Sequence, residues 1–165
     1  GNVAIGQYAG TDLTSASECV FIGYEAGKAK TVNNYCTYVG FKAGAIETGL
    51  WGNTFLGAYA GANCSAGNGM TFVGGSAGYN NTGGSNDAFG YQALNANTGS
   101  LGNVAIGGYA MKYQNSNSTD SYNVALGNNA MGQSGYAHAN HCVGIGYNSQ
   151  MSADAADYQI VVGLD

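Results

Sequence analysis

A nine-residue pattern recurs along the whole chain and constrains its fold more than any other feature of the sequence. It is first written as NVAIGQYAG at residues 2–10, and near copies begin at residues 19, 36, 53 and 70. When the copies are aligned on the glycine that follows an aliphatic residue or Phe, successive glycines are most often about 17 residues apart, and such internal self-similarity is the signature of a repeat architecture. Residues 1–165 are therefore predicted to form a single repeat domain of about ten coils. We call the ten aligned positions the repeat glycines: Gly6, Gly23, Gly40, Gly57, Gly74, Gly90, Gly107, Gly127, Gly146 and Gly163.

Alternating residue types before each repeat glycine predict a β-strand of about five residues. The positions one and three before the glycine are mostly aliphatic or β-branched, and residues two apart share one face of a strand. The position between them is small or aromatic. One coil holds few large apolar side chains, so we expect the face with the small and aromatic residues to stay exposed on a single rod. Other copies of the chain, packed around a symmetry axis, would then cover it. The first five residues of this middle column are Ala4, Phe21, Tyr38, Phe55 and Phe72.

The period of about 17 residues predicts an all-β fold, a repetitive parallel β-roll or β-solenoid. A unit of this length is too short for two helices and too long for one strand of a hairpin. The chain has 29 glycines and only 8% charged residues, but its fixed spacing and 45% hydrophobic content argue against disorder. The absence of Pro fits stacked strands, which need every backbone N–H.

Three further columns accompany the repeat glycines. Ala lies three positions after the glycine in the first eight copies, and Gly follows it in the first five, as expected for a tight turn with positive φ. Asn recurs four positions before the glycine and is predicted to form a hydrogen-bonded ladder along the rod. Hydroxyl residues eight positions after the glycine predict a second ladder, made of Thr14, Thr31, Thr48, Ser65, Thr82 and Thr98.

The copies resemble a known group of fibrous repeats. NTFLGAYAGAN at residue 53, with Thr-Gly turns in NNTGGSN at 80 and NANTGSLGN at 95, resembles the Gly/Asn-rich repeat region of bacteriophage tail fibres. NVAIG is similar to the head repeats of trimeric autotransporter adhesins, although those have a shorter period. The resemblance covers essentially the whole chain. It implies a homotrimeric fibre segment with a structural or adhesive function, in a virion tail fibre or at a cell surface. Its partner would be a host cell-surface glycan or an outer-surface protein.

Two other functions fit the same repeats. A self-assembling extracellular filament or adhesin would pair the open strand ends of successive rods. An ice-binding β-solenoid would use the hydroxyl column, although that column supplies only one residue per coil and ends after six coils.

Charge and motifs argue against several function classes. The net charge is −5, with four lysines and no arginine, which disfavours nucleic-acid binding. No apolar run approaches the roughly 20 residues of a membrane span, so no membrane insertion is expected. The glycines follow the period and no G-K-[ST] motif occurs, so no cofactor is predicted. The carboxylates form no obvious pair, and we expect no enzyme activity.

The cysteines and histidines give weak signals. Cys19 and Cys36 occupy one column a coil apart, within disulfide range, but buried thiols are the favoured interpretation and the bridge stays open. HANHC at 138–142 makes His138 and His141 weak metal candidates, and no metal site is predicted.

Aromatic residues are the candidate binding residues. Trp51, in a variable loop, is the strongest candidate, and Tyr113, Tyr122 and Tyr136 lie in the two irregular loops 113–122 and 132–141. A second set follows the repeat glycines by one or two positions and either stacks on sugar rings or packs between coils. Its members are Tyr8, Tyr24, Tyr59, Tyr91, Tyr109 and Tyr147.

Overall fold

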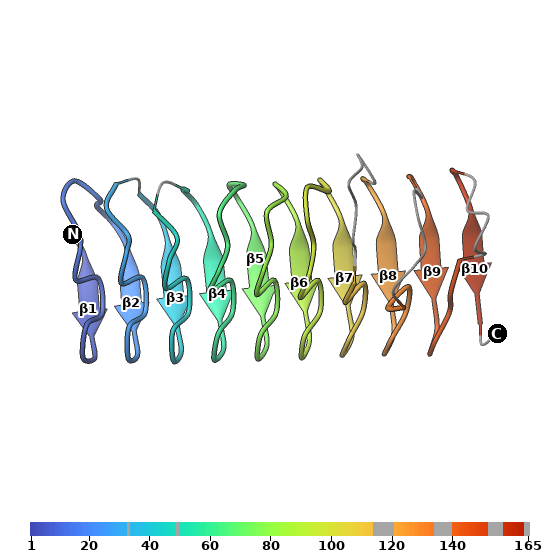
Figure 1. Cartoon of the computed structure of the whole chain (residues 1–165), viewed down its shortest axis with the longest axis horizontal. Helices are drawn as coiled ribbons and strands as arrows, with labels where there is room; N and C mark the ends of the chain where they lie inside the picture. The colour runs from blue at the N-terminus through green and yellow to red at the C-terminus, as the bar shows by residue number, and fades with distance from the viewer. Residues whose placement is uncertain (33, 49, 114–120, 134–139, 152–156, 164–165) are drawn as a thin grey trace.

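The chain is an all-β parallel solenoid whose turns are about 17 residues apart. The computed structural model describes residues 1–32, 34–48, 50–113, 121–133, 140–151 and 157–163, and these contain no helix. Ten strands lie side by side in chain order and form one parallel sheet along the rod (Figure 1). The predicted fold class and period are confirmed. The strands are β1 (Val3–Ile5), β2 (Val20–Ile22), β3 (Thr37–Val39), β4 (Thr54–Leu56), β5 (Thr71–Val73), β6 (Asp87–Phe89), β7 (Val104–Ile106), β8 (Val124–Leu126), β9 (Val143–Ile145) and β10 (Ile160–Val162).

The number of coils stays a prediction. Segments 114–120, 134–139 and 152–156, which belong to three of the returns between strands, lie outside the described residues.

The sheet keeps the register of the sequence columns even where the period changes. Thr71 pairs with Asp87 across an interval that is shorter than the usual one, and Val104 pairs with Val124 across a longer one. Insertions and deletions are therefore absorbed in the returns and leave the pairing of identical columns unchanged.

Each strand has three residues, so the prediction of about five was wrong. The cause is the repeat glycine, whose backbone leaves the extended region. At Gly40 φ is +138°, and a Cβ there would lie 2.5 Å from the carbonyl oxygen of Gly57 in the next coil. Only glycine permits this approach, and the chain turns away from the sheet at this point.

The middle residue of each strand points into the solenoid, so the predicted orientation of the two faces was also wrong. Phe21, Tyr38, Phe55 and Phe72 are fully buried. Their rings form an internal ladder with centroid separations of 5.4, 4.7 and 5.0 Å. The aliphatic columns on either side face outward instead.

Small residues in the turn create the room for these rings. Ala26, three positions after a repeat glycine, is fully buried, and the next residue is Gly27. A Cβ on Gly27 would lie 2.5 Å from the ring of Phe21. The alanine and glycine columns are therefore the wall against which the strand aromatics pack.

Later coils fill the same space differently. The strand residues Ala88, Ala105 and Ala125 are small, and the turn position that was Gly becomes Leu94, Met111 or Met131. These three larger side chains are buried although their φ values are +47° to +49°. In these coils the large side chain belongs to the turn and the small one to the strand, and the coil keeps its shape.

The Asn column forms a ladder from side chain to backbone. Oδ1 of Asn53 accepts a hydrogen bond from the backbone N–H of Met70 at 2.9 Å. Asn103 and Asn123 accept in the same way from the next residue of the column, at 2.9 and 2.8 Å. Because these residues are fully buried, each carbonyl group ties one coil to the next inside the core.

Candidate binding surfaces

The outward columns of the sheet form a continuous apolar strip, which we call the strand face. It holds the first and third residue of every strand from β1 to β10. Ten strands at about 4.8 Å spacing make it roughly 43 Å long. Several large side chains of this strip are exposed to solvent, among them Ile5 at 58% and Leu56 at 47%. Uncovered apolar surface of this extent marks an interaction site.

Over the ten described strands, the strand face carries one charged residue. It is Asp87, whose carboxylate accepts a hydrogen bond from the backbone N–H of Thr71 at 2.9 Å. The remaining positions are aliphatic, Phe89, or one of three threonines in β3, β4 and β5. The strip therefore offers little to a hydrophilic ligand and much to a second apolar surface.

A second feature is a row of aromatic rings at the turn edge, beyond the C-terminal ends of the strands. We call it the aromatic row. Successive centroids are 6.0, 5.3, 5.1 and 6.1 Å apart, and three of the four pairs are edge-on. Four of its rings are exposed and the last is partly buried. Its members are Tyr8, Tyr24, Phe41, Tyr59 and Tyr79.

Charged side chains flank the first part of this row, and two ammonium groups there share one carboxylate. The carboxylate of Glu25 lies 3.0 Å from the ammonium of Lys28 and 3.4 Å from that of Lys42. Hydrogen bonding from Lys28 lowers the pKa of Glu25, and the same contact raises the pKa of Lys28. The two ammonium groups also lie 5.6 Å from the ring centroids of Tyr8 and Phe41, respectively.

Two adjoining cavities open beside the aromatic row, and Tyr59 and Tyr79 line both. One of about 300 Å³ contains the Glu25 charge cluster, and one of about 420 Å³ is uncharged. We call the two together the tyrosine groove. The charged part is half enclosed, and the uncharged part is a shallow, open depression. The uncharged part is lined by Tyr59, Ser76, Tyr79, Asn80, Gln92 and Asn95.

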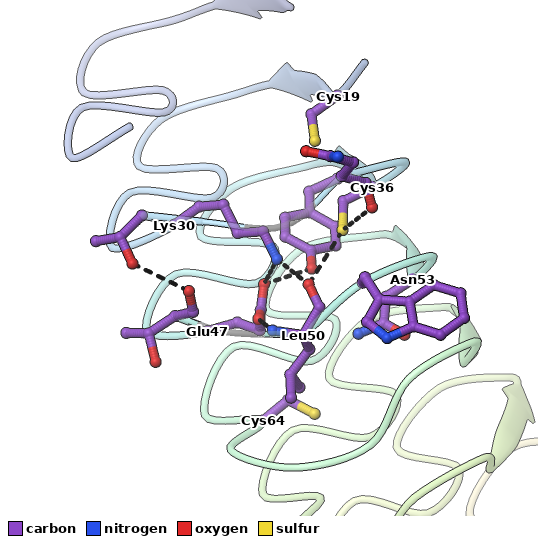
Figure 2. A network of polar contacts seen from close by, with 12 residues as sticks. Cys19, Lys30, Cys36, Glu47, Leu50, Asn53 and Cys64 are labelled. Carbon is purple, nitrogen blue, oxygen red and sulfur yellow. Dashed lines mark hydrogen bonds and ion pairs between the residues drawn. The ribbon is translucent and has the colours of Figure 1, made fainter. Parts of the chain in front are cut away.

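A buried polar network lies inside the solenoid, between the coils of β2 to β4. Lys30 and Glu47 are both fully buried and their charged atoms are 2.7 Å apart (Figure 2). The hydroxyl of Tyr38 donates to Glu47 at 2.7 Å. Leu50 contributes its backbone N–H to the carboxylate and its carbonyl oxygen to the ammonium. Every partner is internal, so this network joins neighbouring coils and presents no reactive group to solvent.

Burial raises the pKa of several groups around this network. The pKa of Tyr38 lies well above its ordinary value, first because of desolvation and second because Glu47 is negative. Burial raises the pKa of Cys64 to about 12 and also raises that of Cys19. All four cysteines are buried and none is in a disulfide. Cys19 and Cys36 therefore match the buried-thiol interpretation, and a thiolate nucleophile is disfavoured at Cys64.

The three predicted binding residues that the structure describes are exposed but lie on separate coils. Trp51 is 54% exposed just before β4, whereas Tyr113 follows β7 with the ammonium of Lys112 4.7 Å from its ring centroid. Tyr122 lies before β8 and stacks on the ring of His141 at 5.4 Å. Tyr136 and His138 fall outside the described residues.

His141 has aromatic neighbours on both sides, because Tyr158 stacks on its other face at 4.9 Å. No group of three or more His, Cys, Asp or Glu side chains suited to a metal ion occurs in the part of the chain that the structure describes.

The predicted hydroxyl column lies on the surface. The hydroxyls of Thr14 and Thr31 donate to the carbonyl oxygens of Thr31 and Thr48 at 2.7 and 3.1 Å. A ladder through the later members, from Ser65 to Thr98, stays a prediction.

Sequence reasoning missed two members of the aromatic row. Phe41 occupies the column of Tyr24 one coil further on, so the column pattern contained its signal. Tyr79 lies five positions after its repeat glycine, where other coils carry Lys28 or Ala45, and no column marks it. Its place beside Tyr59 emerges only when the coils are stacked.

Comparison of the chain with models of protein families, with curated proteins and with solved structures finds no match. Among the described residues there is no helix of the length and apolarity that crossing a membrane requires. A functional proposal for this chain rests on its own residues and geometry.

Proposed function

We propose that this chain is a segment of a homotrimeric fibre with a structural and adhesive, non-enzymatic role. Three solenoids pack through their strand faces, and the assembly attaches to a host-surface glycan or an outer-surface protein. Its place is a virion tail fibre or a cell surface. The observation that carries the proposal is the strand face, a straight apolar strip along the whole described rod.

Burial of the strand face supplies the driving force for association. Complete burial of one Leu, Ile or Val side chain is worth about 1.5–3 kcal/mol. The strip has many such residues in a regular array, so small gains repeat along its length. Because the same strip faces the axis in every copy, a cyclic arrangement closes and leaves no free apolar face. The number three comes from the resemblance to trimeric fibre repeats. The most exposed large residues are Val3, Ile5, Leu56, Phe89, Ile106, Ile145, Ile160 and Val162.

The proposal also accounts for the surfaces left outside. In a trimer joined at the strand face, the turn edge with the aromatic row lies beside the joined faces and occurs three times. Repeated weak sites on a stiff carrier bind with an avidity well above that of one site. A rod held in register by backbone pairing at every coil suits such a carrier.

Ice binding is the second candidate, and one observation favours it. Thr37, Thr54 and Thr71 are neighbours in one outward column of the sheet, each two residues before an aliphatic side chain. The array extends over three coils and then meets Asp87. A single-chain rod that produces thermal hysteresis in solution would establish this function in place of the fibre.

Substitution on the strand face tests the proposal. Leu56→Lys and Ile106→Lys each place a charge in the strip, and we expect sedimentation of either variant to show dissociation to single chains. Thr48→Lys and Thr82→Lys are matched controls, because both residues are exposed in the hydroxyl column, and we expect them to retain the assembly. Assembly that survives both strand-face variants would overturn the proposed packing. A mass that grows with concentration would indicate the end-to-end filament instead.

A further inference from the structure

We propose that the tyrosine groove binds an uncharged oligosaccharide. This inference deepens the adhesive part of the proposed function and rests on it for the chain's role, but the groove and its chemistry belong to a single copy. The aromatic rings, the amide side chains and the charge distribution of the groove each favour such a ligand.

Aromatic rings supply the wall of the groove. Tyr59 and Tyr79 lie 6.1 Å apart and nearly edge-on, so they present differently oriented surfaces to the same space. The apolar C–H face of a pyranose packs on such a ring while its hydroxyls stay outside. The row continues toward β1 through Phe41, 5.1 Å from Tyr59. Its regular steps are suited to an extended chain of sugar units lying along the rod axis.

Amide side chains lie beside the rings, with Asn80 and Gln92 in the uncharged part of the groove and Asn63 in the charged part. Nδ2 of Asn63 donates to Oδ1 of Asn80 at 3.0 Å, and Nε2 of Gln92 donates to the hydroxyl of Tyr91 at 3.1 Å. Nδ2 of Asn80 and Oε1 of Gln92 have no hydrogen-bond partner among the described residues. An amide offers a donor and an acceptor on one rigid plane, which matches the neighbouring hydroxyls of a sugar.

The charge distribution selects a neutral ligand. Of the described residues, no charged side chain lines the 420 Å³ part of the groove. In the 300 Å³ part, Glu25 is already paired with both lysines, and Asp12 is the remaining acid in the lining. With Asp12 counted, two acids face two lysines in this lining, so it has no excess of positive charge to favour an acidic glycan over a neutral one.

Binding to an array of neutral and acidic oligosaccharides tests the inference. We expect the full chain to bind neutral oligosaccharides and Tyr59→Ala to weaken that binding about fivefold to tenfold, with binding retained in Tyr59→Phe. Tyr35→Ala is the matched control, because Tyr35 is exposed and has a positive φ like Tyr59 but lies just before β3, at the other end of a strand. Asn80→Ala, which removes an amide without changing a ring, is expected to weaken binding as well.

The outcomes separate this inference from the proposed function. Absence of binding, equal loss in Tyr35→Ala, or binding restricted to acidic glycans or peptides would overturn the saccharide assignment even if the chain is trimeric. Neutral-glycan binding that depends on Tyr59 in a chain that stays monomeric would support the groove and contradict the trimer. Both measurements use the same purified protein.

Discussion

The repeat glycines from Gly6 to Gly146 let neighbouring coils approach more closely than any other residue would permit. Their φ values lie between +119° and +140°, a region that is essentially reserved for glycine. In most coils a Cβ would also collide with the carbonyl group of the next repeat glycine. Conformation and proximity therefore both require glycine at the position that ends the strand.

Substitution of Gly40, compared with that of a turn glycine that has no close neighbour, measures the cost of the unusual φ and of the close approach between coils. We expect Gly40→Ala to lower the free energy of unfolding by at least about 3 kcal/mol, since its Cβ meets Gly57 at 2.5 Å and φ is +138°. Gly69→Ala is the control, with φ +63° and nothing within 4 Å of the added Cβ, and should cost about 1–2 kcal/mol. Urea denaturation followed by circular dichroism measures both, and equal losses would contradict the close-approach argument.

Volume exchange between strand and turn is the second rule at residue scale. Phe72 is opposed by Gly78, whereas Ala105 is opposed by Met111. A Cβ on Gly78 would lie 2.3 Å from the Phe72 ring, so a large residue fits only where the strand residue is small.

A double-mutant cycle measures this exchange. Phe72→Ala should cost about 3–5 kcal/mol by leaving a cavity, and Gly78→Met alone should cost at least about 1–3 kcal/mol by overpacking. We expect a coupling of about 1–3 kcal/mol that offsets the cost of Gly78→Met, so the double variant should be about as stable as Phe72→Ala alone. Additive losses in chemical denaturation would show that the two positions do not share one space.

The structural unit of this protein is the coil. Residues at equivalent positions of neighbouring coils contact one another and form ladders through the interior. Aromatic rings, Asn side chains and backbone pairing all connect equivalent positions. Lys30 and Glu47 also occupy the same column in neighbouring coils. They form a charged pair at the position where other coils have Cys64 or Asn81. Burial of such a pair is tolerated because each charge has several partners.

Removal of one charge tests this pairing. Lys30→Met leaves a buried carboxylate without its cation and should cost about 3–5 kcal/mol, whereas adding Glu47→Gln should recover part of the loss. Tyr38 and Leu50 donate to different oxygens of Glu47, and Gln retains only one of these two acceptors, so the recovery is partial. Lys28→Met, which breaks an exposed pair, is the control and should leave stability nearly unchanged. Urea midpoints at neutral pH measure these differences, and a double variant less stable than Lys30→Met would contradict the account.

The aligned sequence columns predicted where the strands lie better than they predicted which face of each strand is buried. The period and the repeat glycines located every strand, because stacking requires equivalent positions to align. The inward face was misjudged because both faces are apolar, and alternation says which residues share a face without saying which face is inside. The exchange between Phe72 and Gly78 in one coil and Ala105 and Met111 in another contained the missing information.

The candidate groove was predictable only in part. Tyr59 belongs to a column of turn residues and was recognised as a ring that could contact sugars. Tyr79 and the amides of Asn80 and Gln92 come from three different column positions in two coils. Their meeting depends on how coils of unequal length stack, which spacing along the chain does not reveal.

At the scale of the whole molecule, the solenoid closes its interior and leaves one long apolar strip. Rings, alanines and thiols fill the inside, so a single chain already has a core. The exposed Val, Ile, Leu and Phe side chains of the strand face are not part of that core. The proposed association through this face, with the proposed binding groove present on every copy, accounts for both the strand face and the turn edge.

The most direct test is the solution mass of the unmodified chain by light scattering, at several concentrations. The account predicts three times the 16.7 kDa of one chain at every concentration measured. A mass of one chain would contradict it, since the strand face would then be stable in water without a partner.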